Sequence, residues 1–202
     1  MSNSDSKQWY QHTVLRCIVA VVVVLVAWFA IDSNKLNNGK QNIDSQTGQV
    51  QNVLQRRSDT VTEMVGAVKG AQKHEGSVYE KIAKDRTEYY KNNDKYKNAK
   101  SSGAKEQAMS NQSGAVNAMV GSIKEAYPKL SSNSRMGQLM VELEGSNNRV
   151  SVERRNLQMD TQSYNRLVVD FPSSIIASLT NHHTVSYFKA QPSAQEAPKV
   201  SF

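Results

Sequence analysis

The 202-residue chain has one cysteine, four prolines and only 7% aromatic residues. A single cysteine excludes an intramolecular disulfide and any metal site built from several cysteines. Hydrophobic residues make up 38% of the chain, below the roughly 45–50% of an ordinary globular domain. These shortages argue against a large α/β enzyme with a thick core covered on both faces.

The apolar residues that are present gather near the N-terminus. The fifteen residues from Cys17 to Ile31 contain no charge and no amide. This length falls between the about 20 residues of a spanning helix and the about 10–14 of a signal peptide. Cleavage after Ala27 or Ala30 would place Leu25 or Trp28 at position −3, where signal peptidase prefers a small residue. We therefore predict an uncleaved anchor over residues 17–36, with a cleaved signal peptide as the alternative.

The anchor follows a short flank, residues 1–16, and its direction in the membrane is left open. Lys7 and Arg16 precede the apolar run, and Lys35 and Lys40 follow it. The positive-inside rule needs an excess of basic residues on one side, and here the two sides are equal. The sequence therefore predicts a single-pass protein of the cell membrane without deciding which side holds the remainder.

The rest of the chain has the apolar periodicity of long helices. The segment Asn37-Asn38-Gly39 reads as a hinge, because Asn and Gly weaken helix continuity. Apolar residues then recur every three or four positions from Val50 to Ile82, which predicts a helix about 50 Å long. A turn is expected at 101–103, before a second helix through Met109–Leu130.

A third helix is expected through Met136–Phe171, and Pro172 would end it. A short apolar helix follows at residues 173–179. The predicted fold is all-α: a single N-terminal transmembrane helix, then an antiparallel bundle of three long helices plus a short fourth over residues 40–190. The tail, residues 191–202, is expected to be disordered.

Four polar residues interrupt the apolar stripes: Arg57, Glu75, Asn147 and Arg154. Burying any of them without a partner would be costly, so pairing across the bundle would fix the register of the helices. The alternative is that they lie at the edges of the stripes and reach water. Both interpretations stay open at the level of the sequence.

With these segments placed, the chain resembles the LemA family of bacterial membrane proteins. The similarity covers about 140 residues in the same order. It rests on QVQNVLQRRSDTVTEMVGAVKGAQKHE (49–75), EAYPKL (125–130), NNRVSVERR (147–155), YNRLVVDFPSSIIA (164–177) and SYFKA (186–190). The resemblance implies a helical bundle on a membrane tether and no established catalytic activity.

The chain departs from the family pattern at several positions. Val61-Thr62-Glu63-Met64 replaces an Ile/Leu-Pro-Asn-Leu segment, and Asn147 replaces a Glu. Leu157-Gln158 stands where a Tyr-Asn pair is expected, and a Gly-Phe pair is replaced around His182-His183. The chain is therefore expected to be a divergent member of the family.

A search for catalytic motifs finds little. His74-Glu75 lacks the second histidine of a zinc-binding H-E-x-x-H motif. His182 and His183 are adjacent and could bind a metal only with ligands from elsewhere. A lipid-embedded Cys17 would be a poor nucleophile, and no glycine-rich phosphate loop or G-x-S-x-G motif occurs. We predict no enzymatic activity, no catalytic residue, no cofactor and no metal.

The most informative charged segment is 81–105, with eight Lys or Arg against three Asp or Glu. It is expected to form the tip of a helical hairpin. Its basic residues can be simply solvated, or can contact anionic lipid, an acidic protein partner or nucleic acid. Nucleic acid fits least, because the segment has one arginine and no known binding motif. The candidate contact residues are Lys81, Lys84, Arg86, Lys91, Lys95, Lys97 and Lys100.

The predicted function is a non-catalytic scaffold or interaction module in the bacterial envelope. The bilayer would hold residues 17–31, and an unidentified protein would bind the bundle. Two alternatives are a lipid-binding module that remodels membranes, lying down through the hinge, and an accessory subunit of a membrane enzyme. A homo-oligomer is compatible with all three.

Overall fold

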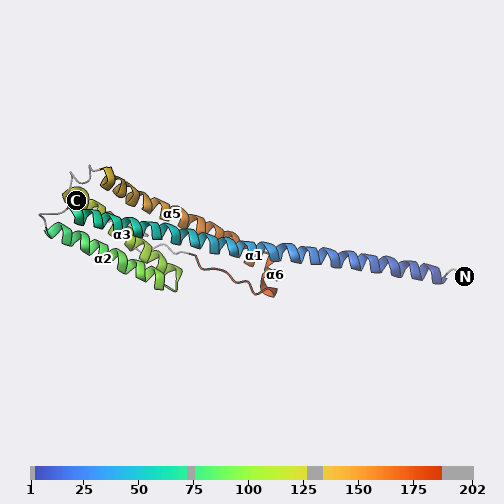
Figure 1. Ribbon diagram of the computed structural model, residues 1–202. Coiled ribbons are helices and arrows are strands. Elements are labelled where there is room, and N and C mark those ends of the chain that lie inside the picture. The colour runs from blue at the N-terminus through green and yellow to red at the C-terminus, as the bar shows by residue number, and fades with distance from the viewer. Residues whose placement is uncertain (1–2, 72–75, 127–133, 188–202) are drawn as a thin grey trace, which may run out of the picture. The chain divides into compact units, whose positions relative to one another are not determined.

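The computed structural model describes residues 3–71, 76–126 and 134–187. Within these ranges the regular structure is entirely helical (Figure 1). The helices are α1 (Asn3–Ala71), α2 (Gly76–Asn98), α3 (Ser102–Ala126), α5 (Ser134–Val169) and α6 (Ser173–Leu179). The predictions of an all-α chain, a long apolar N-terminal helix and a helical bundle are confirmed. The predicted tail lies outside the described residues.

The described residues form two compact units. Unit 1 combines residues from 1–43 with 160–185, and unit 2 combines 44–159 with residues that follow 185. Helices α1 and α5 contribute to both units, because each crosses a boundary between them.

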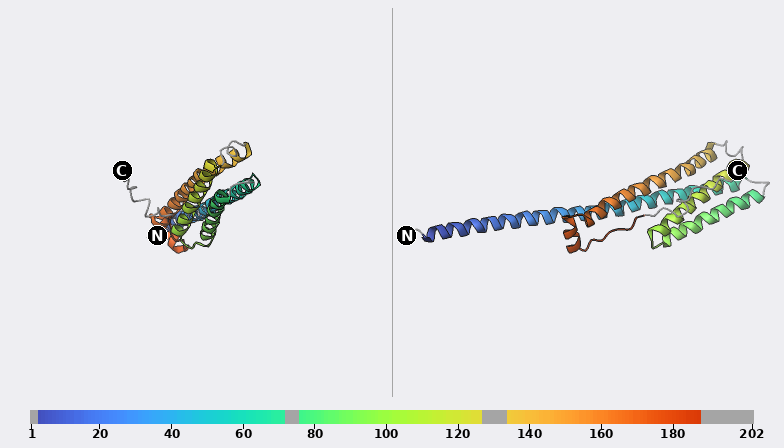
Figure 2. Two further views of the ribbon diagram at one scale, coloured as in Figure 1. Left: turned by 90° about the vertical axis from the view of Figure 1, so that its left-hand side faces the viewer. Right: turned by 180° about the vertical axis from the view of Figure 1, so that it is seen from behind.

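Unit 2 contains a core to which α1, α2, α3 and α5 all contribute, and these helices run alongside one another (Figure 2). Its buried side chains occur at the helical spacings seen in the sequence. The core includes Val61, Met64 and Val68 of α1, Ile82 and Tyr89 of α2, Val116, Met119 and Ile123 of α3, and Met140 and Leu143 of α5.

The prediction of one helix from Val50 to Ile82 is wrong. Helix α1 ends at Ala71 and α2 begins at Gly76, so Ile82 belongs to a second helix. Residues 81–98, expected to be a hairpin tip without a pattern, form most of α2. Their buried face includes Asn92 and Asn93, and these amides hide its periodicity when the sequence is considered alone.

The turn predicted at 101–103 lies about two residues earlier, at 99–101, because Ser102 and Gly103 already belong to α3. Helix α2 ends at Asn98, and α3 begins at Ser102. The Ser101 hydroxyl accepts a hydrogen bond of 3.2 Å from the Ala104 amide, as an N-cap residue does.

The hinge predicted at Asn37-Asn38-Gly39 is also wrong, because α1 is helical through all three residues. A Cβ on Gly39 would lie 3.1 Å from Cδ2 of Tyr164 on α5. In unit 1, Tyr164 is buried, as are Leu36 and Ile43 on α1. Gly39 is therefore a point of close approach between two helices rather than a point of bending.

We predict that Gly39→Leu destabilises unit 1 by about 1–3 kcal/mol, because the new side chain must displace the Tyr164 ring. Gly48 is the matched control, since a Cβ there meets nothing within 4 Å. Gly48→Leu should leave stability unchanged or raise it by about 0.5–1 kcal/mol through better helix propensity. Thermal unfolding of the two variants measures the difference. Equal midpoints would contradict the packing role of Gly39.

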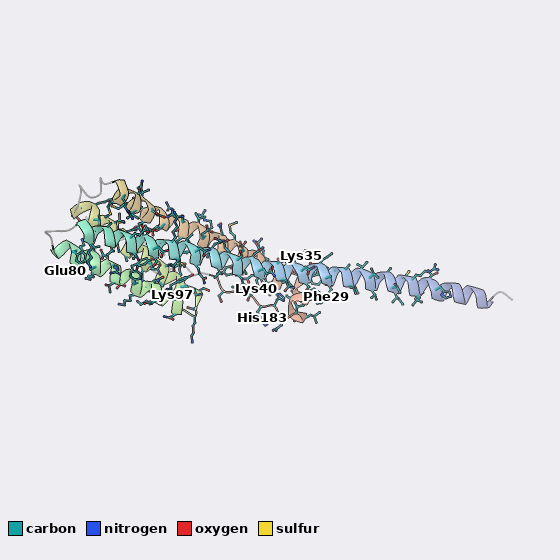
Figure 3. All side chains as sticks on the ribbon, viewed as in Figure 1. Phe29, Lys35, Lys40, Glu80, Lys97 and His183 are labelled. Carbon is teal, nitrogen blue, oxygen red and sulfur yellow. The ribbon has the colours of Figure 1, made fainter. Side chains whose placement is uncertain are left out.

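The apolar stretch of α1 is uncovered. Apart from the partly buried Trp28, its large apolar side chains between Val14 and Ile31 are 41–66% exposed, and side chains project on both sides of the ribbon (Figure 3). The stretch is long and apolar enough to cross a membrane, and none of it is buried within the protein. By length and composition a signal sequence would pass the same test. The apolar stretch is therefore not a core helix packed within this chain.

Candidate interaction surface

All seven predicted contact residues are exposed, six on α2 and Lys100 after it. They do not form a single cluster. The helical spacing places the six contact residues of α2 in two groups, one on each side of the buried face of the helix. Lys81, Lys84, Lys91 and Lys95 share one side, which we call the lysine stripe, and Arg86 and Lys97 lie on the other.

Lys97 lines a groove of about 410 Å³ among α1, α2 and α3. We call it the amide–lysine groove. Each helix supplies polar side chains, and none of the lining residues is acidic. The groove is lined by Gln51, Asn52, Leu54, Gln55, Asn93, Tyr96, Lys97 and Lys105.

The polar groups of this groove are held in place by local contacts. The Lys105 ammonium lies 5.9 Å from the centroid of the Tyr96 ring, within the range of a cation–π interaction. Burial raises the pKa of Tyr96, so its phenol stays neutral. Gln55 donates a 2.9 Å hydrogen bond to Asp59. Two ammonium groups and several amide donors suit a carboxylate or phosphate ligand.

A second groove, of about 470 Å³, lies between α2 and α3 and includes Lys95. Alanines at 99, 104 and 108 leave space between the helices. Asn111 lines this groove and donates a 3.3 Å hydrogen bond to the buried Asn92. With one ammonium group, this groove is less suited to an anion than the amide–lysine groove.

Among the residues that the structure describes, Arg57 has the largest fully buried side chain and is only 1% exposed. Its Nε donates to the Ser146 hydroxyl (3.0 Å), and Nη1 donates to the Ser113 hydroxyl (3.2 Å). Its Nη2 donates to the Ser146 carbonyl (3.2 Å) and to Asn147 Oδ1 (3.0 Å). Burial lowers the pKa of Arg57 from 12.5 to about 10, so it remains charged at neutral pH.

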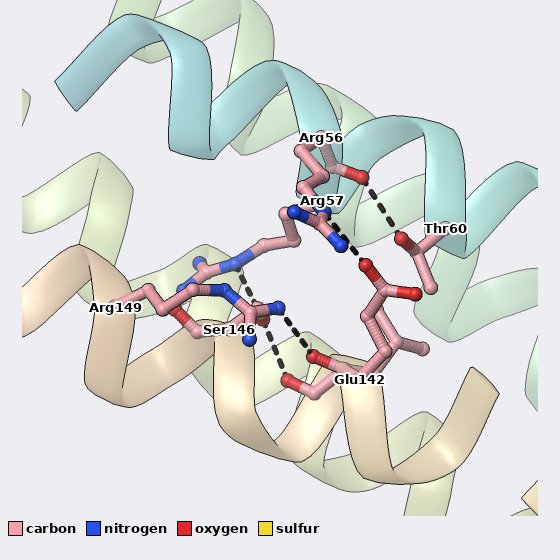
Figure 4. Close-up of polar contacts among 7 residues, drawn as sticks. Arg56, Arg57, Thr60, Glu142, Ser146 and Arg149 are labelled. Carbon is pink, nitrogen blue, oxygen red and sulfur yellow. Dashed lines mark hydrogen bonds and ion pairs between the residues drawn. The ribbon is translucent and has the colours of Figure 1, made fainter. Parts of the chain in front are cut away.

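The surroundings of Arg57 join α1 to α5 (Figure 4). Next to it, Arg56 Nε pairs with Glu142 at 2.7 Å, and Arg149 donates to the Glu142 carbonyl at 3.0 Å. Asn147 adds a second link to α3, beside that of Arg57 to Ser113, through a 2.8 Å hydrogen bond to Asn117. These side chains connect three helices, and we call them the polar layer: Arg56, Arg57, Ser113, Asn117, Glu142, Ser146, Asn147 and Arg149.

Arg154 forms an ion pair with Glu106, which joins α5 to α3. The Glu106 side chain is 8% exposed and that of Arg154 is 30% exposed. Burial raises the pKa of Glu106, and the charge and hydrogen bond of Arg154 partly offset this. The structure thus gives Arg57, Asn147 and Arg154 partners on other helices, and Glu75 lies outside the described residues. That these contacts set the register stays a prediction.

The histidines at the end of unit 1 have local partners. His182 Nδ1 is 3.0 Å from the Thr180 hydroxyl, and His183 Nε2 is 3.1 Å from Asn181 Oδ1. In the part of the chain that the structure describes, no three His, Cys, Asp or Glu side chains gather in a way that could hold a metal. His74 lies outside that part.

The comparison with known families decides the relationship. The LemA family model matches residues 46–202, most of the chain. The chain belongs to the LemA family. No curated protein matches it.

The LemA match includes the amide–lysine groove and every residue of the polar layer. The apolar stretch of α1 precedes the matched region. The interaction surface therefore belongs to the LemA part of this protein, and the apolar stretch lies outside that part.

Sequence reasoning missed most residues of these sites. Gln51, Asn52 and Lys105 carry no motif, and only their meeting around Lys97 gives them a shared role. Ser113 and Ser146, the partners of Arg57, are single small polar residues on apolar stripes. The signal in the sequence that could have identified them is their position in the apolar stripes. A serine that faces a core can form a hydrogen bond with a buried polar group.

Proposed function

We propose that this LemA-family protein is a single-pass membrane protein whose bundle acts as a non-catalytic scaffold in the bacterial envelope. Its amide–lysine groove would bind an acidic segment of a protein partner. The observation that carries this proposal is the composition of the groove: two lysines and four amides, with no acidic lining residue.

The exposed apolar side chains of α1 support the membrane anchor. A bare apolar helix of this length is unfavourable in water, whereas the hydrocarbon of a bilayer would cover it on all sides. Helix α1 supplies this apolar stretch and also one wall of the groove, through Gln51, Asn52 and Gln55. One helix would thus tether the binding surface to the membrane.

An acidic peptide suits the groove better than a neutral one. Carboxylates would pair with Lys97 and Lys105, and charge-assisted hydrogen bonds are the strongest available to such side chains. The amides of Gln51, Asn52 and Asn93 can donate to further carboxylate oxygens or to the peptide backbone. Electrostatic attraction would also increase the rate of association.

Binding of a fluorescent oligo-glutamate peptide to the purified full-length protein tests this proposal. Lys97→Glu with Lys105→Glu should weaken binding by about tenfold or more, equivalent to at least about 1.4 kcal/mol. Lys81→Glu with Lys84→Glu is the matched control, because it makes the same change of net charge on the lysine stripe. Equal losses in the two variants would contradict specific binding in the groove.

A second candidate function, contact with anionic lipid, is favoured by the lysine stripe. Its four exposed lysines share one side of α2, and each basic residue near an anionic surface contributes about 1 kcal/mol. Because the anchor would hold every variant in the bilayer, an environment-sensitive fluorophore on a single cysteine, in a Cys17→Ala background, separates the candidates in vesicles. Lipid contact predicts a larger blue shift at Lys84→Cys than at Lys97→Cys when the vesicles are anionic instead of neutral, and the peptide groove predicts no such order.

A further inference from the structure

We propose that the corner between α5 and α6 inserts into the headgroup interface of the bilayer that holds α1. This inference rests on the proposed membrane anchor and adds a second contact with the lipid. The corner consists of Val169, Phe171, Ile175 and Leu179, all within unit 1.

The four side chains of the corner are the first observation. Phe171 is 81% exposed, Leu179 71%, Val169 64% and Ile175 47%. They occur within eleven residues of chain, whereas the exposed large apolar residues of α5 in unit 2, such as Val141 and Val152, are widely spaced. Single exposed apolar residues are ordinary, but a group of them marks an interaction surface.

The lack of charge in helix α6 is the second observation. Its sequence, SSIIASL, contains no charged residue. Ser173, Ile176 and Ala177 form its buried side. Ile175 and Leu179, four residues apart, share the outward side with the exposed Ser178. The open side of α6 thus carries two large apolar side chains beside a serine hydroxyl, a composition that suits the boundary between lipid headgroups and acyl chains.

The corner is held in place by its own contacts. The Ser173 hydroxyl donates to the carbonyls of Leu167 (2.7 Å) and Asp170 (3.0 Å). Asn165 holds the segment after α6, donating to the Val185 carbonyl and accepting from the Val185 amide, both at 2.8 Å. These contacts tie the corner to the end of α5, and the exposed side chains therefore belong to a defined surface.

The position of the corner along α1 identifies the bilayer as its partner. Burial on α1 begins at Asp32, one residue after the apolar stretch ends at Ile31. Helix α6 lies beside the part of α1 that carries Phe29, Lys35 and Lys40 (Figure 3). The packed part of unit 1 therefore starts where a membrane-spanning α1 would leave the hydrocarbon.

Two basic residues near the corner suit the same position, and one acidic residue, the exposed Asp170, lies between Val169 and Phe171. Lys35 pairs with the buried Asp32 at 2.9 Å and keeps its side chain about half exposed, and Arg166 is exposed in the last turn of α5. Long basic side chains can extend to lipid phosphates while apolar neighbours enter the interface. The corner would thus fix the depth and rotation of α1 in the bilayer.

Tryptophan quenching by brominated lipids tests this inference in vesicles that contain the full-length protein. The test variant is Phe171→Trp in a background of Trp9→Phe and Trp28→Phe. Bromines near the headgroup end of the acyl chain should quench the introduced tryptophan more than bromines near the chain terminus, and its emission should be blue-shifted. Leu179→Trp in the same background is the second variant, should the first fail to fold.

Two reference proteins make each outcome decisive. Trp9→Phe alone leaves Trp28 to report on the anchor, and Val141→Trp in the tryptophan-free background reports an exposed site of unit 2 that should not be quenched. Quenching of Trp28 without quenching in either corner variant would overturn the corner contact and leave the anchor standing. A blue shift without quenching in the corner variants would also overturn it, in favour of a protein partner or a second copy. Unquenched Trp28 would overturn the anchor itself.

Discussion

Arg154→Met should lower the free energy of unfolding by about 3 kcal/mol at neutral pH. Breaking a buried ion pair by removing one partner typically costs about 3–5 kcal/mol, because the other charge stays buried without compensation. Here the remaining charge is Glu106, whose side chain is 8% exposed. We expect the lower end of that range, because Arg154 itself is partly exposed.

The loss should depend on pH in a defined direction. Burial already raises the pKa of Glu106 above 4.5, against the opposing effect of Arg154. A raised pKa means that the folded state binds the proton more tightly than the unfolded state. Stability is then gained as the pH falls through the folded pKa and lost as the pH rises through it. The deficit of Arg154→Met should therefore shrink as the pH falls through the folded pKa of Glu106 and stay constant above it.

Urea unfolding of the detergent-solubilised protein, followed by circular dichroism, measures this effect. The control is Glu106→Gln with Arg154→Met, which removes both charges and should recover most of the lost stability and abolish the pH dependence. If Arg154→Met keeps wild-type stability and a single oligomeric state, the pair has no role in fixing the register.

Arg57→Ala should lower the free energy of unfolding by about 3–5 kcal/mol. Truncating a large buried side chain leaves a cavity, which costs about 2–5 kcal/mol in protein cores. The substitution also removes four hydrogen bonds, to Ser113, Ser146 and Asn147. The two serines keep partners through the carbonyls of Met109 (3.1 Å) and Leu143 (2.6 Å), so the cavity should account for most of the loss.

Arg57→Met separates the charge of Arg57 from its volume. Methionine fills most of the space and carries no charge, and replacing a buried ion by an apolar residue of similar volume is often neutral or stabilising. We therefore expect Arg57→Met to retain at least half of the stability that Arg57→Ala loses. A loss as large as that of Arg57→Ala would show that the hydrogen bonds, not the packing, hold the polar layer together.

If Arg57 sets the register, Arg57→Met should lose the specificity of helix alignment while the protein keeps most of its stability. The protein should stay folded but populate more than one helix alignment or oligomeric state, because its polar layer no longer penalises shifted pairings. Disulfide trapping between one cysteine on α1 and one on α5, in a Cys17→Ala background, measures this. Cross-linking only at the native register would contradict the role.

The errors in the sequence-based predictions have a common physical origin. The hinge at 37–39 was inferred from local propensity, yet packing of Tyr164 against Gly39 holds α1 helical there. The face of α2 was missed because Asn92 and Asn93 are buried where a stripe would have apolar residues. In both cases tertiary contacts outweighed preferences that act within a few residues.

The candidate site was predictable only in part. Lys97 was identified from a local excess of positive charge, but its neighbours Gln51 and Lys105 lie 46 residues before it and 8 after it in the sequence. Charge density along a chain does not reveal which side of a helix each residue occupies once the helix is packed. The division of the basic residues into a lysine stripe and a groove therefore required the fold.

The sequence by itself determined the helical class, the apolar stretch of α1, the α2–α3 turn and the LemA relationship. Each of these follows from short-range periodicity or composition, which survive in any arrangement of the helices. Only the tertiary structure decided the partners of Arg57 and Arg154, the role of Gly39, the lining of the amide–lysine groove and the exposure of the α5–α6 corner. These depend on which helix faces meet, a choice made by packing between residues far apart in the chain.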